Sequence, residues 1–334
     1  MKITRLSKQR VRAVQPIGVG TSLLYVQRAG RKLLSIDYTV ETDNYVSTDL
    51  AVLSNRITRT GIVDMAYQGE PFGVVWCVLA NGKLIGFTYD RQQEVTGWHR
   101  HPIGGDGFVE AVAVIPAPDG TREELWAVVR RTINGATTRY VEYLEAPWEG
   151  ADEDGTGGDD QEDAFYVDSG LTYDGVSTTS ITGLDHLEGE TVQILADGAT
   201  QPDQVVSGGA ITLDRAASVV QAGLQAPARL VTMRIEAGSG DGTAQGKTKR
   251  VHSATVRFVD TLGGRVGQYG GRVDDISRRS PSTPMGEPEP IFSGDRDVDF
   301  PGDYDTDCRV EIRQDQPYPM TVAAIMPRLR TYDR

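Results

Sequence analysis

The sequence predicts an all-β protein, with partial β-propeller-like blades followed by a small β-barrel or sandwich domain and a C-terminal β hairpin. Three observations lead there. Short alternating segments recur along the chain, 38 Gly and 16 Pro are spread over its 334 residues, and Asn-Gly pairs separate several segments. We expect propeller-like repeats over 1–148, an acidic Gly-rich linker or loop over 149–163, a barrel or sandwich over 164–263, and a Pro/Gly-rich arm with a closing hairpin over 264–334.

Residues 1–148 contain a repeat of about 50 residues. Tyr25, Trp76 and Trp126 recur at intervals of 51 and 50 residues, each followed by a strand, a Gly-containing turn and a second strand. Four short strands per repeat are typical of a propeller blade, although a plain antiparallel meander is the alternative. We interpret the three aromatic residues as blade-packing positions. Closed propellers typically have about four to eight blades. We therefore expect either that the blades stack as an open layer of sheets, or that another chain or an upstream region supplies the missing blades.

The later elements are also mostly strands. One short helix is expected after Thr48, with Leu50, Leu53 and Ile57 on one face. Strands are expected near 164–167, 192–195, 210–213, 219–224, 229–236 and 251–260. Prolines mark 280–301 as an extended arm. The segments 309–314 and 320–326 are expected to form the closing hairpin.

The charge is unevenly distributed along the chain. Residues 1–148 hold 17 basic and 15 acidic side chains, whereas 149–334 hold 17 basic and 32 acidic ones. The segment 149–163 alone contains eight acids, which predict a solvated loop, or a channel-facing strip or trap for divalent ions. The residues of this acidic strip are Asp152, Glu153, Asp154, Asp159, Asp160, Glu162 and Asp163. A protein with a net charge of −13 is a poor candidate for tight binding of duplex DNA.

Several other classes are disfavoured. The longest apolar run, Val74 to Ala80, is far shorter than the ~20 residues of a membrane helix, so no membrane insertion is expected. The basic N-terminus lacks the apolar region of a signal peptide. Cys77 and Cys308 are the only cysteines, which excludes a disulfide scaffold and suits a reducing compartment.

No cofactor and no catalytic residue are expected. Asp295, Asp297 and Asp299 are weak candidates for a calcium site, because the spacing of an EF-hand loop fails. His99 and His101 share one face of a strand, but two ligands do not make a zinc site. The Asp185-His186 pair and Ser180 lack the nucleophile elbow of a hydrolase. Trp98 and Trp148 lie outside the repeat positions and could stack on sugars.

The ordered segments of the chain resemble a known family. The first three are YVQRAGRKLLSIDY (25–38), TGIVDMAYQGEPFGVVWCVLANGKLIGFTYDRQQEVTGWHRH (60–101) and RRTINGATTRYVEYLE (130–145). The second part contributes ITGLDHLEGETVQILADGA (181–199) and RVEIRQDQPYPMTVAAIMPRL (309–329). Together these segments resemble the tail-nozzle (phage stabilisation or tail hub) proteins of short-tailed bacteriophages. The region 164–237 is similar to a small β-barrel module also found in ubiquitin-activating enzymes.

The resemblance implies a structural virion protein and no enzymatic activity. Such proteins form a homo-hexameric ring below the portal and adaptor proteins, extend the DNA ejection channel, and carry needle, fibre or spike proteins. Genomic DNA passes through transiently, and the expected location is the virion tail after assembly in the host cytoplasm. Family members are longer, with an N-terminal region that helps to complete a propeller. A carbohydrate- or receptor-binding tail adhesin and a glycan-degrading enzyme are the alternatives.

Overall fold

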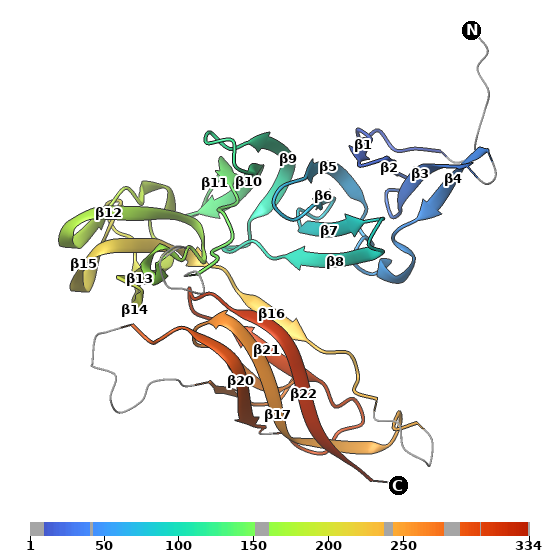
Figure 1. Cartoon of the computed structure of the whole chain (residues 1–334). Coiled ribbons are helices and arrows are strands. Elements are labelled where there is room, and N and C mark those ends of the chain that lie inside the picture. Colours follow the sequence, from blue (N-terminus) through green and yellow to red (C-terminus); the bar gives the residue numbers. More distant parts are fainter. Residues whose placement is uncertain are drawn as a thin grey trace. The chain divides into compact units, whose positions relative to one another are not determined.

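The chain is all-β (Figure 1). The computed structural model describes residues 10–40, 43–150, 160–236, 243–276, 288–300 and 302–332. They form two compact units, 1–146 and 147–334, each described below by itself. The first unit ends at residue 146, two residues before the expected end of the repeats at 148.

The first unit contains three successive antiparallel sheets, each with its strands in up-and-down order. The first sheet consists of β1 (Ile17–Val19), β2 (Ser22–Val26), β3 (Leu33–Thr39) and β4 (Asn44–Asp49). The second consists of β5 (Ile62–Gln68), β6 (Val74–Leu79), β7 (Leu84–Asp90) and β8 (Val95–His101). The third consists of β9 (Phe108–Pro116), β10 (Glu123–Ile133) and β11 (Ala136–Tyr143). The 50-residue repeat in the sequence therefore corresponds to one sheet per repeat.

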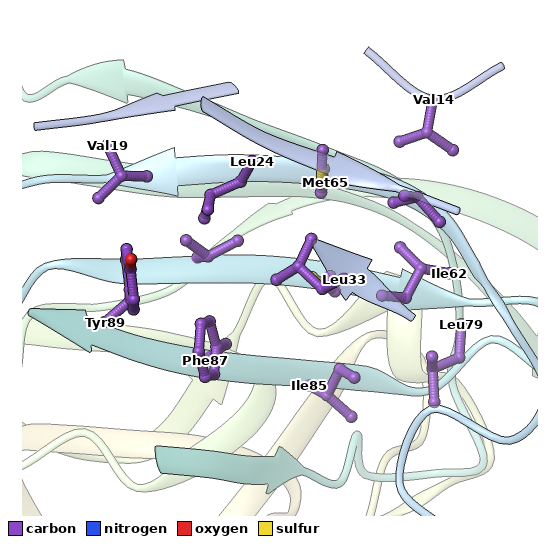
Figure 2. Packing of buried hydrophobic residues seen from close by; sticks show 13 residues of the cluster. Val14, Val19, Leu24, Leu33, Ile62, Met65, Leu79, Ile85, Phe87 and Tyr89 are labelled. Carbon is purple, nitrogen blue, oxygen red and sulfur yellow. The ribbon is translucent and has the colours of Figure 1, made fainter. Parts of the chain in front are cut away.

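Apolar side chains fill the space between neighbouring sheets. Leu24 and Leu33 of the first sheet pack with Ile85 and Phe87 of the second (Figure 2). On the other face of the second sheet, a separate cluster joins Trp76 and other residues to the third sheet. Its buried members are Val74, Trp76, Val78, Leu84, Val109, Leu125 and Val129. Because β6 is buried on both faces, its sequence VVWCVL is continuously apolar rather than alternating.

A turn glycine marks each contact between neighbouring sheets. The Gly30 carbonyl accepts a hydrogen bond from the Ile62 N–H at 2.7 Å, and the Gly82 carbonyl accepts one from the Val109 N–H at 2.9 Å. A Cβ on Gly82 would lie 2.3 Å from the Phe108 ring, so only glycine fits there. These turns thus serve both to reverse the chain and to hold the first strand of the next sheet.

The expected short helix is wrong in extent. Only one turn of 3-10 helix, η2 (Val52–Ser54), follows β4. Leu50 and Ile57 do pack against the cluster between the first two sheets, but Leu53 is 99% exposed. The three-residue turn is too short to bring all three side chains to one face.

The second unit begins with a four-stranded sheet in the order β12-β15-β13-β14. Its strands are β12 (Val167–Thr182), β13 (Thr191–Ala196), β14 (Ala199–Val205) and β15 (Ala210–Gln225). The 3-10 turns η3 (Gln161–Asp163) and η4 (Asp185–Leu187) precede β12 and β13. The register between β12 and β15 shifts at three places, and such bulges bend long strands. We call residues 160–225 the acidic module.

The remaining strands form a sandwich of two sheets. One sheet has the order β16-β21-β18-β19 and the other β20-β17-β22. The strands are β16 (Ala228–Val231), β17 (Thr248–Thr261), β18 (Arg265–Gln268), β19 (Val273–Asp275), β20 (Phe292–Asp299), β21 (Val310–Gln314) and β22 (Thr321–Tyr332). Val256 and Phe258 of β17 meet Val310 and Ile312 of β21 in one buried cluster.

Three expectations for the second unit are corrected by this pairing. β21 and β22 belong to different sheets, so 309–326 is not a hairpin. β16 and β17 pair with strands near the C-terminus, so a domain of 164–263 is not a structural unit. The described part of the expected arm contains β20, which pairs with β17; residues 277–287 and 301 lie outside the described residues. Alternation identifies a strand, but it does not identify a partner far away in the chain.

Arg131 provides a test of how the third sheet is held together. Its guanidinium is fully buried, donates two hydrogen bonds to Glu142 at 2.7 and 2.8 Å, and donates a third to the Gly104 carbonyl at 2.5 Å. Arg139 makes a similar forked contact with Glu110, at 2.7 and 3.2 Å, but is 65% exposed.

We expect Arg131→Met to lower the free energy of unfolding by about 3–5 kcal/mol, because it leaves a carboxylate and a carbonyl without their buried donor. Arg139→Met is the matched control and should cost less than about 1 kcal/mol, because water replaces the lost contact. Urea unfolding monitored by tryptophan fluorescence measures both. Equal losses in the two variants would contradict a special role for the buried pair.

Candidate interaction surfaces

Most of the excess negative charge of the chain lies in one region. The acidic module, residues 160–225, contains eleven acidic residues and one basic residue, Arg215. Residues 226–334 contain sixteen of each sign. Six acids of the module are exposed: Asp160, Asp163, Asp174, Asp185, Asp203 and Asp214. The acidic half of the sequence therefore divides into a strongly negative module and a sandwich with balanced charge.

The structure shows the end of the predicted acidic strip as part of this module. Asp160 precedes η3, which contains Glu162 and Asp163. The Asp160 carbonyl accepts a hydrogen bond from the Trp148 indole at 3.0 Å, and the Glu162 carbonyl accepts one from Gln221 at 3.2 Å. The other predicted members, Asp152, Glu153, Asp154 and Asp159, lie outside the described residues.

Glu162 shows the effect of the crowded negative charge. Partial burial raises its pKa, and the neighbouring carboxylates of Asp197, Asp163, Asp160 and Asp174 raise it further. All four neighbours carry the same charge as Glu162, so its ionised form is disfavoured. The local potential is therefore negative, which is a property that repels polyanions.

The carboxylates proposed as a weak calcium site are held by cross-strand partners. Asp295, Asp297 and Asp299 alternate along β20, which places them on one face. Asp295 accepts two hydrogen bonds from Arg257 at 2.7 and 2.9 Å, and the Thr255 hydroxyl donates to Asp297. Arg257 lowers the pKa of Asp295. Their alternating pattern thus serves strand pairing.

Metal-ligating side chains do not gather in the described part of the chain. It contains no group of three or more His, Cys, Asp or Glu residues placed to hold a metal ion. Cys77 is buried between the first two sheets and Cys308 in the sandwich, and burial raises the pKa of both thiols. Both are in the reduced form and function as small apolar core residues.

The three aromatic residues assigned to blade packing occupy the second strand of their sheets, but not the same face. Trp76 lies in the cluster between the second and third sheets. Trp126 lies at the matching position of the third sheet, on the face turned away from that cluster. Tyr25 lies between Leu24 and Val26, which both face the second sheet, so its own side chain is on the opposite face and meets Ser47 at 2.9 Å. Leu24, one residue earlier, is the true counterpart of Trp76.

Trp98 and Trp148, the candidates for stacking on sugars, are both engaged within their own units. The Trp98 ring stacks on Phe87 with centroids 4.4 Å apart, and its indole N–H donates to the Leu50 carbonyl at 2.9 Å. Trp148 packs with a buried cluster that includes Leu195, Leu262 and Tyr318. Both tryptophans are therefore partly buried and take part in packing within their own units.

Asp185 and His186 do not form a catalytic arrangement with Ser180. His186 Nε2 lies 2.7 Å from the carbonyl oxygen of Ser169, which is eleven residues before Ser180 on the same strand, β12. A general base must reach the hydroxyl proton that it removes. The described contacts of His186 therefore position a loop.

A surface that the sequence did not reveal covers the outer face of the third sheet. Trp126 and Tyr143 pack together with ring centroids 5.2 Å apart. Val141 beside them and Ile115 on β9 are both exposed. Ion pairs flank this apolar strip, with Glu110 bound to Arg139 on one side and Arg122 bound to Glu145 on the other. The alternation of β10 and β11 contained the signal, since its apolar residues fall on both faces.

A pair of histidines lies beside Trp76 on the second sheet. His99 Nδ1 is 2.6 Å from His101 Nε2, and the Trp76 and His101 rings meet edge to face with centroids 4.6 Å apart. Gly86 separates Trp76 from His99 in the register, and a Cβ there would lie 2.1 Å from the His99 ring. Burial lowers the pKa of His99, and burial together with the nearby His99 lowers that of His101 to about 4.

Comparisons with known proteins give no family. No protein-family model matches the chain, and no curated protein matches it. Among solved structures, it is similar to the exo-beta-1,3-galactanase of Phanerochaete chrysosporium, in crystal structures with beta-1,3-galactotriose and with galactose. The identity is 10% in both, with 92% and 93% of this chain and 65% of that chain covered, and the TM-scores are 0.24 and 0.21. Scores this low support no conclusion about shared fold or activity.

No helix among the described residues has the length and apolar character needed to cross a membrane.

The histidine pair predicts a pH-dependent stability. The pKa of each histidine in the folded state is below its ordinary value of 6.5. The unfolded chain therefore binds more protons between pH 6.5 and about 4, and the free energy of unfolding falls as the pH falls through this window. We expect His101→Gln to remove up to about 3 kcal/mol of that fall.

Chemical denaturation at several pH values measures this effect. His252→Gln, at an exposed position on β17, is the control and should keep the pH dependence of the wild type. An unchanged slope in His101→Gln would show that the pair does not titrate in this way.

Proposed function

We propose that the chain is a structural component of the tail of a short-tailed bacteriophage. In this proposal, six copies form a nozzle ring that extends the DNA channel below the portal and adaptor and carries needle, fibre or spike proteins. The role is architectural and does not include catalysis. The ordered sequence motifs that resemble this family are the starting point.

The main support comes from the distribution of charge. A channel wall must let a polyanion pass without binding it, and a surface rich in carboxylates repels phosphate. The acidic module has eleven acidic residues against one arginine, and four neighbouring carboxylates add to the effect of burial in raising the pKa of Glu162. We infer that this module faces the passing genome.

The high content of paired strands also suits a rigid ring. Antiparallel sheets satisfy their backbone hydrogen bonds between strands, and packed sheets resist deformation. The second unit adds long strands, β12 and β15 with 16 residues each, that pair along most of their length. Long paired strands are expected in a rigid channel wall, whereas a flexible adapter would contain fewer of them.

The alternative is a carbohydrate- or receptor-binding tail adhesin. It needs aromatic rings with a free face for the ligand. Trp98 and Trp148, the two candidates from the sequence, are packed against Phe87 and a buried cluster, respectively. We therefore favour the nozzle.

The copy number of the chain in purified particles tests the proposal. Quantitative mass spectrometry against the major capsid protein should give about six copies, the count implied by a single closed ring. Three or eighteen copies would instead indicate a spike or fibre. Absence from the particles would overturn the proposal.

Charge reversal in the acidic module gives a second test. We expect Asp174→Lys combined with Asp203→Lys to slow genome release from particles, because two exposed cations would attract phosphate. Asp299→Lys with Asp303→Lys, at exposed positions on the sandwich side, is the matched control. Both double variants should retain the wild-type copy number. Equal release rates in the two would show that the acidic module does not face the DNA.

A further inference from the structure

The third sheet repeats the surface by which the second sheet binds its neighbour. Trp76 and Val78 of β6 correspond to Trp126 and Val128 of β10, and Leu84 corresponds to Val141, because Val78 pairs with Leu84 as Val128 pairs with Val141. In the second sheet these side chains are buried against the third. Leu84 is 4% exposed, whereas Val141 is 70% exposed. The third sheet thus has an apolar docking face with nothing on it among the described residues of its unit.

The match between the second and third sheets lies in their apolar faces and not in their turns. Gly82 follows Val78 by four residues, whereas Gly135 follows Val128 by seven, so the hairpin of the third sheet is longer. A contact through the third sheet would bury the side chains that correspond to Trp76, Val78 and Leu84.

The first sheet carries the matching half of such a contact. Val11 pairs with Gln27 as Ile62 pairs with Leu79, and Arg28 donates to the Arg10 carbonyl as Ala80 donates to that of Gly61. Val11 is therefore the counterpart of Ile62, the residue whose N–H binds Gly30. Ile62 is fully buried, but Val11 is 59% exposed.

The outer face of the first sheet is apolar as well. Leu23, Tyr38 and Tyr45 are exposed there, with the two tyrosine rings 5.5 Å apart. Two similar interfaces join neighbouring sheets inside the stack. Each end of the stack thus exposes one half of an interface of this kind. One end offers the apolar strip of the third sheet, and the other offers the apolar face of the first sheet and the exposed side chain of Val11.

We propose that the first sheet of a second copy of this chain docks on the third sheet, with Leu23, Tyr38 and Tyr45 of one copy against the apolar strip of Trp126, Val141 and Tyr143 of the other. Closed propellers have about four to eight sheets, and six is the only multiple of three in that range. Two copies therefore close the ring, each contributing three sheets, and both end faces of both copies are covered at once. The pair has two-fold symmetry, with two identical contacts between unlike sheets.

This inference goes beyond the proposed function and does not depend on it. A two-copy ring of sheets is compatible with six copies in a particle, as three pairs, but it forms from the purified chain alone. The copy number in particles and the association of the purified chain are separate measurements, so that either proposal can fail without the other.

Sedimentation equilibrium of the full chain tests the association. The wild type should be a dimer. Val141→Glu places a charge on the third sheet and Val11→Glu places one on the first, and each should weaken dimerisation by at least about 100-fold because it affects both contacts of the pair. Val176→Glu, at an 85% exposed position on β12, is the control and should dimerise normally. Circular dichroism checks that all three remain folded.

Mixing the two variants identifies the faces. A Val141→Glu copy still has a native first sheet, and a Val11→Glu copy still has a native third sheet, so one of the two contacts is intact in the mixed pair. Partial recovery of dimer in the mixture supports the proposal. A monomeric wild type, a dimer unaffected by either variant, or an assembly with an odd number of copies would overturn it.

Discussion

The burial of both faces of the second sheet is the constraint on which the first unit depends. Val75 and Cys77 of β6 pack toward the first sheet, while Trp76 and Val78 pack toward the third. A sheet with two apolar faces is stable in water only between two neighbours. Hydrogen bonds at Gly30 and Gly82 fix where each neighbour begins. Asp64 adds a polar link, since its carboxylate accepts hydrogen bonds from Met65 on β5 and Val112 on β9.

The sequence predicted the repeat of about 50 residues, but it did not predict which face of a strand each aromatic side chain occupies. Intervals of 51 and 50 residues located the three sheets, and Asn134-Gly135 marked a tight turn. The same alignment placed Tyr25 opposite Trp76, although Leu24 is the residue on the matching face. A shift of one residue reverses every side chain of a strand, so an interval of 51 rather than 52 changes the face. Aromatic character alone could not distinguish these two alignments.

The second unit shows a different limit. Its strands were visible as alternating segments, but their partners were not. β17 pairs with β20 and β22, and the paired residues are 31 to 84 positions apart in the chain. The local pattern of a strand does not identify partners at that separation. Asp295, a weak candidate metal ligand in the sequence, is the cross-strand partner of Arg257. The acidic strip was predicted from its composition. Its hydrogen bonds with Trp148 and Gln221 could not be predicted, because the positions of these two residues follow from the fold.

Both units are built from antiparallel sheets, but their exposed faces differ in character. Those of the first unit are apolar, and those of the acidic module are charged. In the first unit, each sheet has apolar residues on both faces. Neighbouring sheets bury these faces, except for the two outer faces at the ends of the stack. In the second unit, the acidic module points charge outward from a sheet whose inner residues, such as Ile194 and Val220, are buried. Its negative potential opposes close approach by another acidic surface. Association of copies is therefore favoured through the first unit and disfavoured through the acidic module, which separates the surface that joins chains from the surface that repels.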